Sequence, residues 1–290
     1  MPQHDYLTTR EVAALLRVKE RKVYDLAASG ELPCRRLTGK LLFARAEIEA
    51  LLAGKAGGAA RTAPARPDVL VGSHDPLLEW ALRESGSGIA AFFDGSLDGL
   101  DRFGRGGAIA CGLHVHEPER AGWNVGHVAA RFANAPVVLV EWARRRQGLI
   151  SSGAPLTAMP DLRGRRVALR QPTAGARVLF DHLLAQSGLT LDHIAVVPGA
   201  ARTESEAAAA VASGDADATL GLEAMARQFR LAFHPLIEER YDLLVDRRAW
   251  FEPPLQALLA FCRTPAFAER ARMLGGYDIS GFGTVHWNGP

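Results

Sequence analysis

The chain has few cysteines and no long apolar run. Its three cysteines, Cys34, Cys111 and Cys262, lie far apart and form no C-x-x-C pair, so the sequence indicates neither a disulfide framework nor a structural zinc site. No stretch reaches the roughly 18 apolar residues that suggest a transmembrane helix. The opening residues, MPQHDYLTTREV, lack the charged start and apolar run of a secretory signal, and we therefore expect a cytoplasmic protein.

Signatures of the common enzyme classes are also missing. The sequence contains no G-x-S-x-G elbow, no Walker loop, no dinucleotide-binding glycine fingerprint and no metal-ligand spacing. His114 and His116 form an H-x-H pair at the expected end of a strand, but no third ligand is evident nearby, so we predict no metal site. We expect a protein that is not an enzyme and needs no cofactor; an enzyme built on the α/β part is the weaker alternative.

The net charge of +2 is distributed unevenly along the 290 residues. Residues 1–66 carry 12 Lys/Arg and 7 Asp/Glu, whereas the remaining residues carry 22 and 25. A small basic part joined to a slightly acidic larger part is typical of a nucleic-acid-binding module attached to another domain. The stretch GKAGGAARTAPARP has no apolar periodicity, so we interpret residues 54–66 as a linker between a domain at 1–53 and a domain at 67–290.

The first domain is predicted to contain three helices and a hairpin. Thr8-Thr9-Arg10-Glu11 is a capping box, so a helix is expected to begin here. A second helix is predicted over residues 19–28 from its apolar spacing. A short hairpin over residues 34–44 and a last helix from about residue 46 complete the order helix, turn, helix, wing, helix.

This segment resembles the winged-helix DNA-binding domain of the MerR and phage-excisionase group. The matching pieces are YLTTREVAALLRV, KERKVYDLAASG, ELP and LLFARAEIEALL. The resemblance implies a double-stranded DNA partner, with the second helix in the major groove and the wing on the backbone or minor groove. Long basic side chains reach phosphates, and Arg also reads guanine edges. The candidate DNA contacts are Lys19, Arg21, Lys22, Tyr24, Arg35, Arg36 and Lys40.

Short apolar strands alternate with helices from residue 68 onward, which predicts a parallel α/β sheet. Three expected strand-to-helix turns carry a hydroxyl residue where the helix begins, namely Ser73, Ser96 and Thr173. Ligands of open α/β sheets bind outside the carboxyl ends of the strands, and a helix start attracts anions through its free N–H groups. The three turns therefore predict an anion site, although Ser and Thr are also ordinary helix caps.

Residues 68–290 resemble the periplasmic-binding-protein (PBP) superfamily, specifically a cytoplasmic domain found behind helix-turn-helix segments. The matching pieces include GSHDPLLEWAL, DGSLDGLDRFGRGGAIACGLHVH, ARRRQGLI, VALRQPTAGARVLFDHLL and AAAAVASGDADATLGLEAMARQF. The resemblance implies a two-lobed, type II α/β fold with parallel-rich sheets. Crossing strands are expected near residues 137–141 and 236–245, with the second lobe at about 158–232. Where the family has N-R-x-x-G-S-G-T-R, this chain reads RQPTAGAR, which lacks two hydroxyls and predicts altered polar contacts.

The superfamily includes molybdate- and tungstate-binding proteins, in which backbone N–H and hydroxyl groups at helix starts hold the oxyanion. This implies a molybdate or tungstate effector here, with a small carboxylate such as formate, or a molybdenum-cofactor-like molecule, as alternatives. The expected ligand contacts are Ser73, His74, Ser96, Thr173, Ala174, Gly175, Arg177, Asn124 and Glu223.

The two resemblances together imply a one-component transcriptional regulator. A homodimer or higher homo-oligomer is expected, because a single winged helix gives limited specificity and paired half-sites are usual. An excisionase-type architectural protein, in which the large domain serves only assembly, is the alternative. Arg144-Arg145-Arg146 is interpreted as a surface or hinge cluster rather than a second DNA site.

Overall fold

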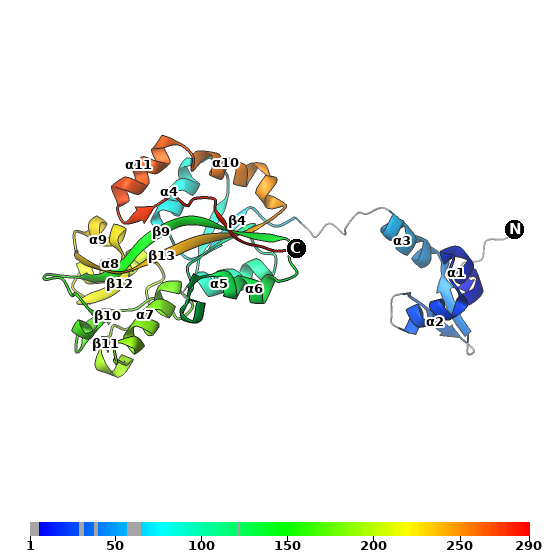
Figure 1. Cartoon of the computed structure of the whole chain (residues 1–290), viewed down its shortest axis with the longest axis horizontal. Helices are drawn as coiled ribbons and strands as arrows, with labels where there is room; N and C mark the ends of the chain where they lie inside the picture. The colour runs from blue at the N-terminus through cyan, green and yellow to red at the C-terminus, as the bar shows by residue number, and fades with distance from the viewer. Residues whose placement is uncertain (1–5, 29–31, 38–39, 57–64, 121) are drawn as a thin grey trace. The chain divides into compact units, whose positions relative to one another are not determined.

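The structure is a computed structural model that describes residues 6–28, 32–37, 40–56, 65–120 and 122–290. The chain divides into two compact units, residues 1–65 and residues 66–290, which are coloured blue and cyan to red in Figure 1. The fold class expected from the sequence is confirmed: a small helix-turn-helix unit precedes a larger α/β unit.

The small unit packs three helices against a three-stranded sheet of order β1-β3-β2. Its elements are β1 (Tyr6–Thr8), α1 (Thr9–Leu16), α2 (Glu20–Ala28), β2 (Arg35–Leu37), β3 (Lys40–Ala44) and α3 (Arg45–Ala56). Apolar side chains from every layer form one core, which includes Leu7, Val12, Val23, Phe43 and Ile48. The predicted hairpin is present as β2 and β3, and the Thr38-Gly39 turn between them lies outside the described residues.

The capping box at the start of α1 is confirmed. The Glu11 backbone N–H donates to Thr8 Oγ1 at 3.3 Å, and the Thr8 backbone N–H donates to Glu11 Oε2 at 2.7 Å. These bonds satisfy two N–H groups that a helix start otherwise leaves without partners. The strand β1, which is not expected from the sequence, pairs antiparallel with β3 from Tyr6↔Ala44 onward. Three residues are too short for periodicity to reveal, so only the partner strand identifies β1.

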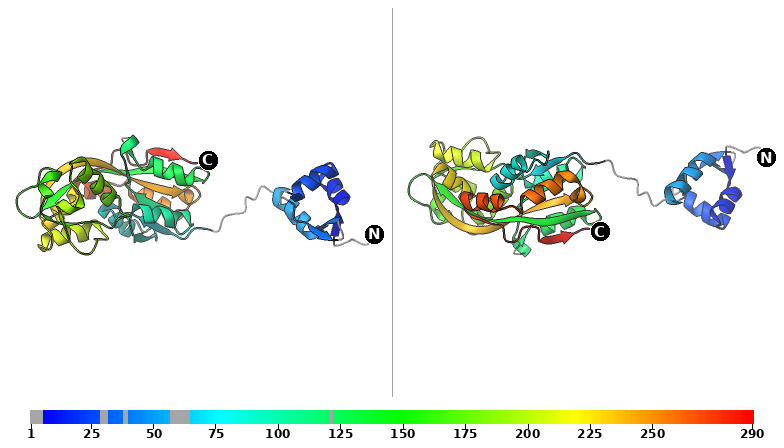
Figure 2. Two further views of the ribbon diagram at one scale, coloured as in Figure 1. Left: turned by 90° about the horizontal axis from the view of Figure 1, so that it is seen from below. Right: turned by 90° about the horizontal axis from the view of Figure 1, so that it is seen from above.

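A ten-stranded sheet runs through the whole of the large unit. Its path is β11-β10-β12-β9-β13-β6-β4-β5, and β14 (Tyr277–Asp278) and β15 (Val285–Asn288) add to β9. The two long strands β9 (Val137–Ser151) and β13 (Ala232–Asp246) pair antiparallel along their length. They extend well beyond the short crossings expected from the sequence and connect two lobes, as the views in Figure 2 show.

Lobe one is formed by residues before β9 and after β13. Its strands β5, β4 and β6 are parallel to one another, and β6 pairs antiparallel with β13. The elements of lobe one are β4 (Val69–Gly72), α4 (Pro76–Glu84), β5 (Ala90–Phe93), α5 (Ser96–Gly104), β6 (Ala110–Leu113), β7 (His116–Glu117), β8 (Gly122–Trp123), α6 (Val125–Phe132), α10 (Pro253–Phe261) and α11 (Pro265–Leu274). Leu70 and Val71 belong to different cores, because successive side chains of a strand point to opposite faces.

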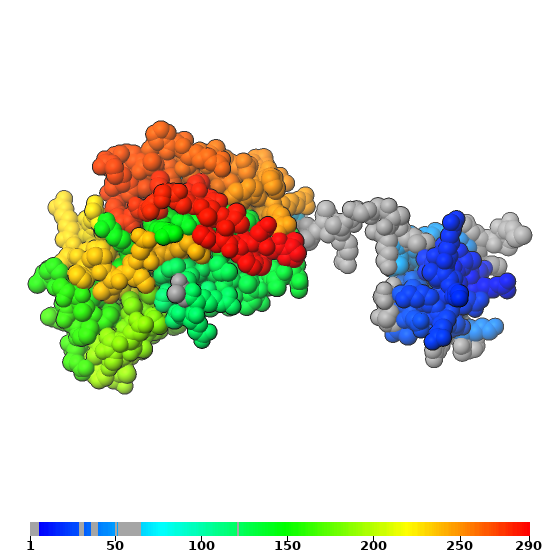
Figure 3. Space-filling model, in the orientation of Figure 1, coloured from blue at the N-terminus to red at the C-terminus, as the bar shows by residue number. Residues whose placement is uncertain are grey.

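Lobe two is formed by residues between the two long strands. Its strands β11, β10 and β12 are parallel, and β12 pairs antiparallel with β9. The elements of lobe two are β10 (Arg166–Ala168), α7 (Gly175–Gln186), β11 (Ala195–Val196), α8 (Glu204–Ala212), β12 (Ala218–Leu222) and α9 (Glu223–Phe229). The C-terminal segment returns to lie along β9, and it is drawn in red in the space-filling view of Figure 3.

Candidate functional site

The two lobes touch where α5 and α7 begin. The backbone N–H of Leu97 donates to the carbonyl oxygen of Thr173 at 3.1 Å, and Thr173 Oγ1 donates to Asp98 Oδ2 at 2.6 Å. Gln171 Nε2 donates to the carbonyl oxygen of Asp94. We call this set of bonds between residues 94–98 and 171–175 the interlobe contact. A surface pocket of about 480 Å³ opens beside it, lined by Asp94, Asp98, Gln171, Thr173, Ala200 and Arg202.

Two glycines allow the lobes to approach this closely. A Cβ atom on Gly175 would lie 2.5 Å from the carbonyl oxygen of His114 and 3.0 Å from its ring. A Cβ atom on Gly95 would lie 3.1 Å from the carbonyl oxygen of Thr173, and Gly95 has a φ of +133°. Glycine adopts this backbone conformation without steric cost, unlike residues with a Cβ. The backbones themselves therefore form the contact surface.

The three hydroxyl residues that the sequence places at helix starts are not the N-caps of those helices. The N-cap of α4 is Asp75, whose Oδ1 accepts from the Leu78 backbone N–H at 2.7 Å, and not Ser73. The N-caps of α5 and α7 are Gly95 and Ala174, and neither makes a side-chain capping bond. The first N–H groups of a helix have no partner within it. Two helix starts without capping side chains, one from each lobe, thus meet at the interlobe contact.

Directly behind the contact lies a cluster of charged side chains that are fully buried. Arg145 of β9 donates from Nη1 to Asp75 Oδ2 at 2.8 Å and from Nη2 to Glu239 of β13. Asp75 also accepts from Trp142 Nε1 at 3.1 Å and from Tyr277 Oη at 2.6 Å. We call Asp75, Arg145 and Glu239 the buried charge cluster.

Both members of the Arg145–Glu239 pair are stabilised in their charged forms. Burial alone would raise the pKa of Glu239, but the charges of Arg145 and His114 outweigh it and lower the pKa from 4.5 to about 2. Burial alone would lower the pKa of Arg145, but Glu239 and Asp75 outweigh it and raise the pKa. A buried pair of this kind is strongly destabilised if one partner is removed, because the other charge is then uncompensated.

His114 connects the cluster to the interlobe contact. Its Nδ1 lies 2.7 Å from Glu239 Oε2, and its Nε2 lies 2.8 Å from Ser73 Oγ. The backbone N–H of His114 donates to Ser96 Oγ at 3.3 Å. The ring also stacks on Tyr241, with centroids 5.8 Å apart. Ser73 and Ser96, which the sequence placed on separate turns, therefore converge on one histidine, whereas the Thr173 hydroxyl is directed to Asp98.

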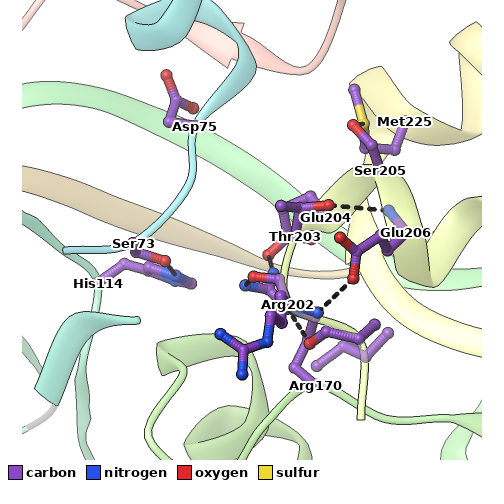
Figure 4. Close-up of polar contacts among 12 residues, drawn as sticks. Ser73, Asp75, His114, Arg170, Arg202, Thr203, Glu204, Ser205, Glu206 and Met225 are labelled. Carbon is purple, nitrogen blue, oxygen red and sulfur yellow. Dashed lines mark hydrogen bonds and ion pairs between the residues drawn. The ribbon is translucent and has the colours of Figure 1, made fainter. Parts of the chain in front are cut away.

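Lobe two presents its own buried ion pair. Arg170 Nη1 donates to Glu204 Oε1 at 2.5 Å, and its other nitrogens donate to the carbonyl oxygens of Ala201 and Arg202. Figure 4 shows this group together with Ser73, His114 and Asp75 of lobe one. The second carboxylate oxygen of Glu204 is buried and has no hydrogen-bond partner among the described residues. Arg170 holds the loop before α8 in place.

The remaining predicted ligand residues are engaged elsewhere. His74 Nε2 lies 3.2 Å from Glu79 Oε2, and Arg177 binds Asp181 one turn along α7. Asn124 Oδ1 accepts from the Val115 backbone N–H at 2.6 Å. Its Nδ2 donates to the carbonyl oxygens of Leu113 and Arg240 and to Asp242 Oδ2. Glu223 pairs with Arg146 and Arg227. These four side chains are not brought together at the interlobe contact, and their role in ligand binding stays a prediction.

The buried charge cluster is not among the features expected from the sequence. Residues 144–146 were expected to form a surface or hinge cluster; Arg144 and Arg146 are each 51% exposed, whereas the Arg145 side chain is completely buried. Strand alternation was the available signal, because neighbours in a strand face opposite sides. The burial of Asp75 and Glu239 carries no comparable local signal.

The ring of His116 contacts other residues than the ring of His114 does. The His116 ring contacts His182 of α7 and Trp123, with centroids 4.8 Å and 5.0 Å apart. Among the residues that the structure describes, no three His, Cys, Asp or Glu side chains are grouped so that they could hold a metal ion. Nor is any described helix both long and apolar enough to span a membrane.

In the small unit, α2 exposes one polar face. Val23 is buried in the core, whereas Arg21, Lys22 and Tyr24 are exposed, as is Lys19 just before the helix. On the wing, Lys40 is exposed, and Arg35 donates from Nη1 to Tyr6 Oη at 3.0 Å. The side chain of Arg36 lies outside the described part of the chain. The described basic side chains are thus available on the helix and wing where DNA contact was predicted.

Comparisons with known proteins match both units. The family described as helix-turn-helix domain matches residues 6–56, and the family described as PBP superfamily domain matches residues 78–263. The chain is 28% identical to the protein YvgK of Bacillus subtilis over 96% of each chain. It is 34% identical, over 27% of its own length and 70% of the other's, to a Clostridium pasteurianum protein named for the 5′ region of a ferredoxin 2Fe-2S gene.

A solved structure from Clostridium perfringens shares the fold of the large unit. It is described as "a Putative Phosphate ABC Transporter Substrate-Binding Protein with Bound Phosphate", and it aligns with a TM-score of 0.53 and 10% identity over 71% of this chain and 96% of that one. Neither matched family is a catalytic one, and a DNA-binding domain joined to a binding-protein-like domain fits a regulator that senses a small ligand. The chain belongs to the family of PBP superfamily domain proteins, and it carries a helix-turn-helix domain at its N-terminus.

Proposed function

We propose that this protein is a transcriptional regulator that senses a small anion between its two lobes, with molybdate and tungstate as the first effectors to test. The observation that carries the proposal is the meeting of two helix starts without capping side chains at the Leu97–Thr173 contact. Free N–H groups and the partial positive charge of helix starts favour anions. Ser73 and Ser96 would add hydroxyl groups from lobe one.

The DNA-binding part of the proposal rests on the helix-turn-helix match and on α2. Arg21, Lys22 and Tyr24 would enter the major groove, with Arg35 and Lys40 of the wing on the phosphate backbone. A homodimer would place two such units on paired half-sites. We also propose that this unit is a winged helix of the MerR and phage-excisionase type. Ligand-driven closure of the lobes would then change how the paired units engage their sites.

Isothermal titration of the full chain with sodium molybdate tests the sensing part. We expect one saturable site per chain, with weaker binding of sulfate, because a site that fits molybdate is too wide to hold the smaller sulfate ion equally well. Formate and a molybdenum-cofactor-like ligand are the alternatives if molybdate does not bind. If molybdate, tungstate, sulfate and formate all fail to show saturable binding, that result contradicts the proposal of an anion sensor and favours the architectural alternative.

Footprinting on the DNA upstream of the protein's own gene tests the regulatory part. We expect a protected site whose occupancy changes when molybdate is added, because a regulator must couple ligand to DNA affinity. A footprint that is identical with and without every anion that binds would contradict regulation by that ligand. If no site is protected under any condition, that result contradicts the proposal that the protein binds this DNA.

A further inference from the structure

A second surface pocket opens on lobe one. It is lined by β7, by the 3-10 turn η1 (Pro118–Arg120) and by α6, and we call it the α6 pocket. Its volume of about 510 Å³ falls within the roughly 300–1,000 Å³ that small-molecule sites occupy. Among the residues that the structure describes, the α6 pocket and the pocket beside the interlobe contact share no lining residue. The α6 pocket is therefore a separate candidate for a ligand site.

One carboxylate of the α6 pocket is already used by the protein. Glu117 is buried, and its Oε1 accepts from the His127 backbone N–H at 2.8 Å. His127 is the third residue of α6, and the N-cap of that helix, Asn124, makes no side-chain capping bond. Glu117 therefore takes the place of a cap, and its charge is offset by the partial positive charge of the helix start. This carboxylate stabilises the helix rather than a ligand.

The charged side chains that remain at the α6 pocket carry a net positive charge. They are Glu119, Arg120 and Arg131, and all three are exposed. The ion pair of Arg131 with Asp101 spans 3.7 Å between side chains that are 39% and 56% exposed, so it is weak. The planar fork of a guanidinium matches a carboxylate through two parallel N–H···O bonds. The α6 pocket thus favours an anionic group, and a carboxylate in particular.

Two imidazole rings supply the aromatic surface of the α6 pocket. His116 of β7 and His127 of α6 both line it. Burial lowers the pKa of each ring below its ordinary value of 6.5, and the nearby His182 lowers the pKa of His116 further. Both rings are therefore mainly neutral at about pH 7 and add aromatic surface rather than charge. Aromatic rings pack well on one another in offset-stacked or edge-to-face contacts, so a ligand with a planar ring fits this wall.

We propose that the α6 pocket binds a small aromatic carboxylate, with the carboxylate held by Arg131 and Arg120 and the ring placed against His116 and His127. The inference goes beyond the proposed function, because this second site does not depend on an anion bound between the lobes. His116 also contacts His182 of lobe two, with ring centroids 4.8 Å apart. A ligand in the α6 pocket therefore borders a side chain that touches the other lobe.

Isothermal titration of the full chain with sodium benzoate tests the chemical class. We expect one saturable site per chain. Benzamide keeps the ring but has no charge, and it should bind at least tenfold more weakly, because the charge-assisted bonds to arginine are lost. Cyclohexanecarboxylate keeps the charge but has no aromatic ring, and it should bind about threefold more weakly or worse, because the aromatic contacts are lost. Absence of saturable benzoate binding, or equal binding of either analogue, would overturn the proposal.

Two pairs of variants test the location. Ala130→Phe fills the α6 pocket from an exposed position of α6, and Ala185→Phe, at an exposed position of α7 outside the pocket, is its control. Arg131→Gln removes a guanidinium from the pocket, and Arg105→Gln at the exposed end of α5 is its control. We expect benzoate affinity to fall at least tenfold in the first variant of each pair and to stay unchanged in the controls. Urea unfolding checks that all four variants are folded. If the pocket variants bind benzoate as tightly as their controls, the proposal is wrong.

Molybdate titrations on the same variants keep this inference apart from the proposed function. Ala130→Phe should leave molybdate binding unchanged, because Ala130 does not line the pocket beside the interlobe contact. If benzoate binds the wild-type chain and molybdate does not, the α6 pocket stands and molybdate sensing fails. If Ala130→Phe abolishes the binding of both, the two ligands share the α6 pocket, and the inference of a separate site is wrong.

Discussion

The backbone N–H of Leu97 in lobe one donates to the carbonyl oxygen of Thr173 in lobe two across 3.1 Å. Because both groups belong to the backbone, this bond depends on how closely the lobes approach and not on a particular side chain. Gly95 and Gly175 permit that approach. An atom added at either glycine would therefore hold the two backbones farther apart.

Gly175→Ala is expected to prevent full closure. The added methyl group would lie 2.5 Å from the carbonyl oxygen of His114, which is backbone and cannot rotate away. We expect molybdate affinity to fall at least tenfold, together with a larger radius of gyration in small-angle scattering with ligand present. Gly104→Ala on α5 is the control, because its new methyl group would lie 3.7 Å from the Phe132 ring, an ordinary contact. Equal closure of both variants would contradict this view of the interlobe contact.

Arg145→Met is expected to destabilise the large unit by about 3–5 kcal/mol, because it leaves Asp75 and Glu239 buried without a positive partner. Arg144→Met should cost less than about 1 kcal/mol, because Arg144 is half exposed and its ion pairs are screened by solvent. Urea unfolding followed by tryptophan fluorescence measures the difference. All five tryptophans lie after residue 66, so the signal reports only the large unit.

Acid unfolding should reveal the lowered pKa of Glu239. The pKa is about 2 in the folded protein against 4.5 ordinarily, so this carboxylate contributes stability above about pH 4.5 that is lost as the pH falls toward 2. The contribution to the free energy of unfolding amounts to roughly 3 kcal/mol, because lowering a pKa by one corresponds to about 1.4 kcal/mol.

Glu239→Gln should therefore flatten the dependence of unfolding free energy on pH between about 4.5 and 2, relative to Glu238→Gln, which changes the neighbouring, exposed residue of β13. Urea titrations at a series of acidic pH values measure both slopes. If the two variants lose stability in parallel, Glu239 does not carry the acid sensitivity of this unit.

Lys22→Ala and Arg21→Ala are expected to weaken DNA binding, because both side chains are exposed on α2. If Lys22 contacts a phosphate, its loss should weaken binding to all sequences and reduce the slope of log affinity against log salt concentration by about 0.9. Arg21, if it reads a base, should instead relax sequence preference. Fluorescence anisotropy at several salt concentrations measures both effects.

Arg105→Ala is the control for these variants. Arg105 is an exposed arginine at the end of α5 in the large unit, so its removal changes net charge equally without touching the predicted DNA surface. A loss of affinity in this variant that matches Lys22→Ala would indicate a general charge effect and contradict a specific role for α2.

Features that depend on neighbours along the chain were predictable. The capping box of Thr8 and Glu11 needs only four consecutive residues, and the alternation of strands and helices from residue 68 follows from local apolar spacing. The hairpin of β2 and β3 has a short connection and was predicted for the same reason. In each case the interacting groups are close in sequence, so their pattern is visible there.

Features that depend on distant partners were decided by the tertiary structure alone. Asp75 caps α4 and binds Arg145, seventy residues away, and Glu239 reaches His114 across a still longer separation. The sequence determined which residues could be charged, donate or accept, and which would form strands. Only the pairing of β9 with β13 turned Arg145 and Glu239 inward toward one another, because burial and partners of a side chain are properties of the assembled sheet.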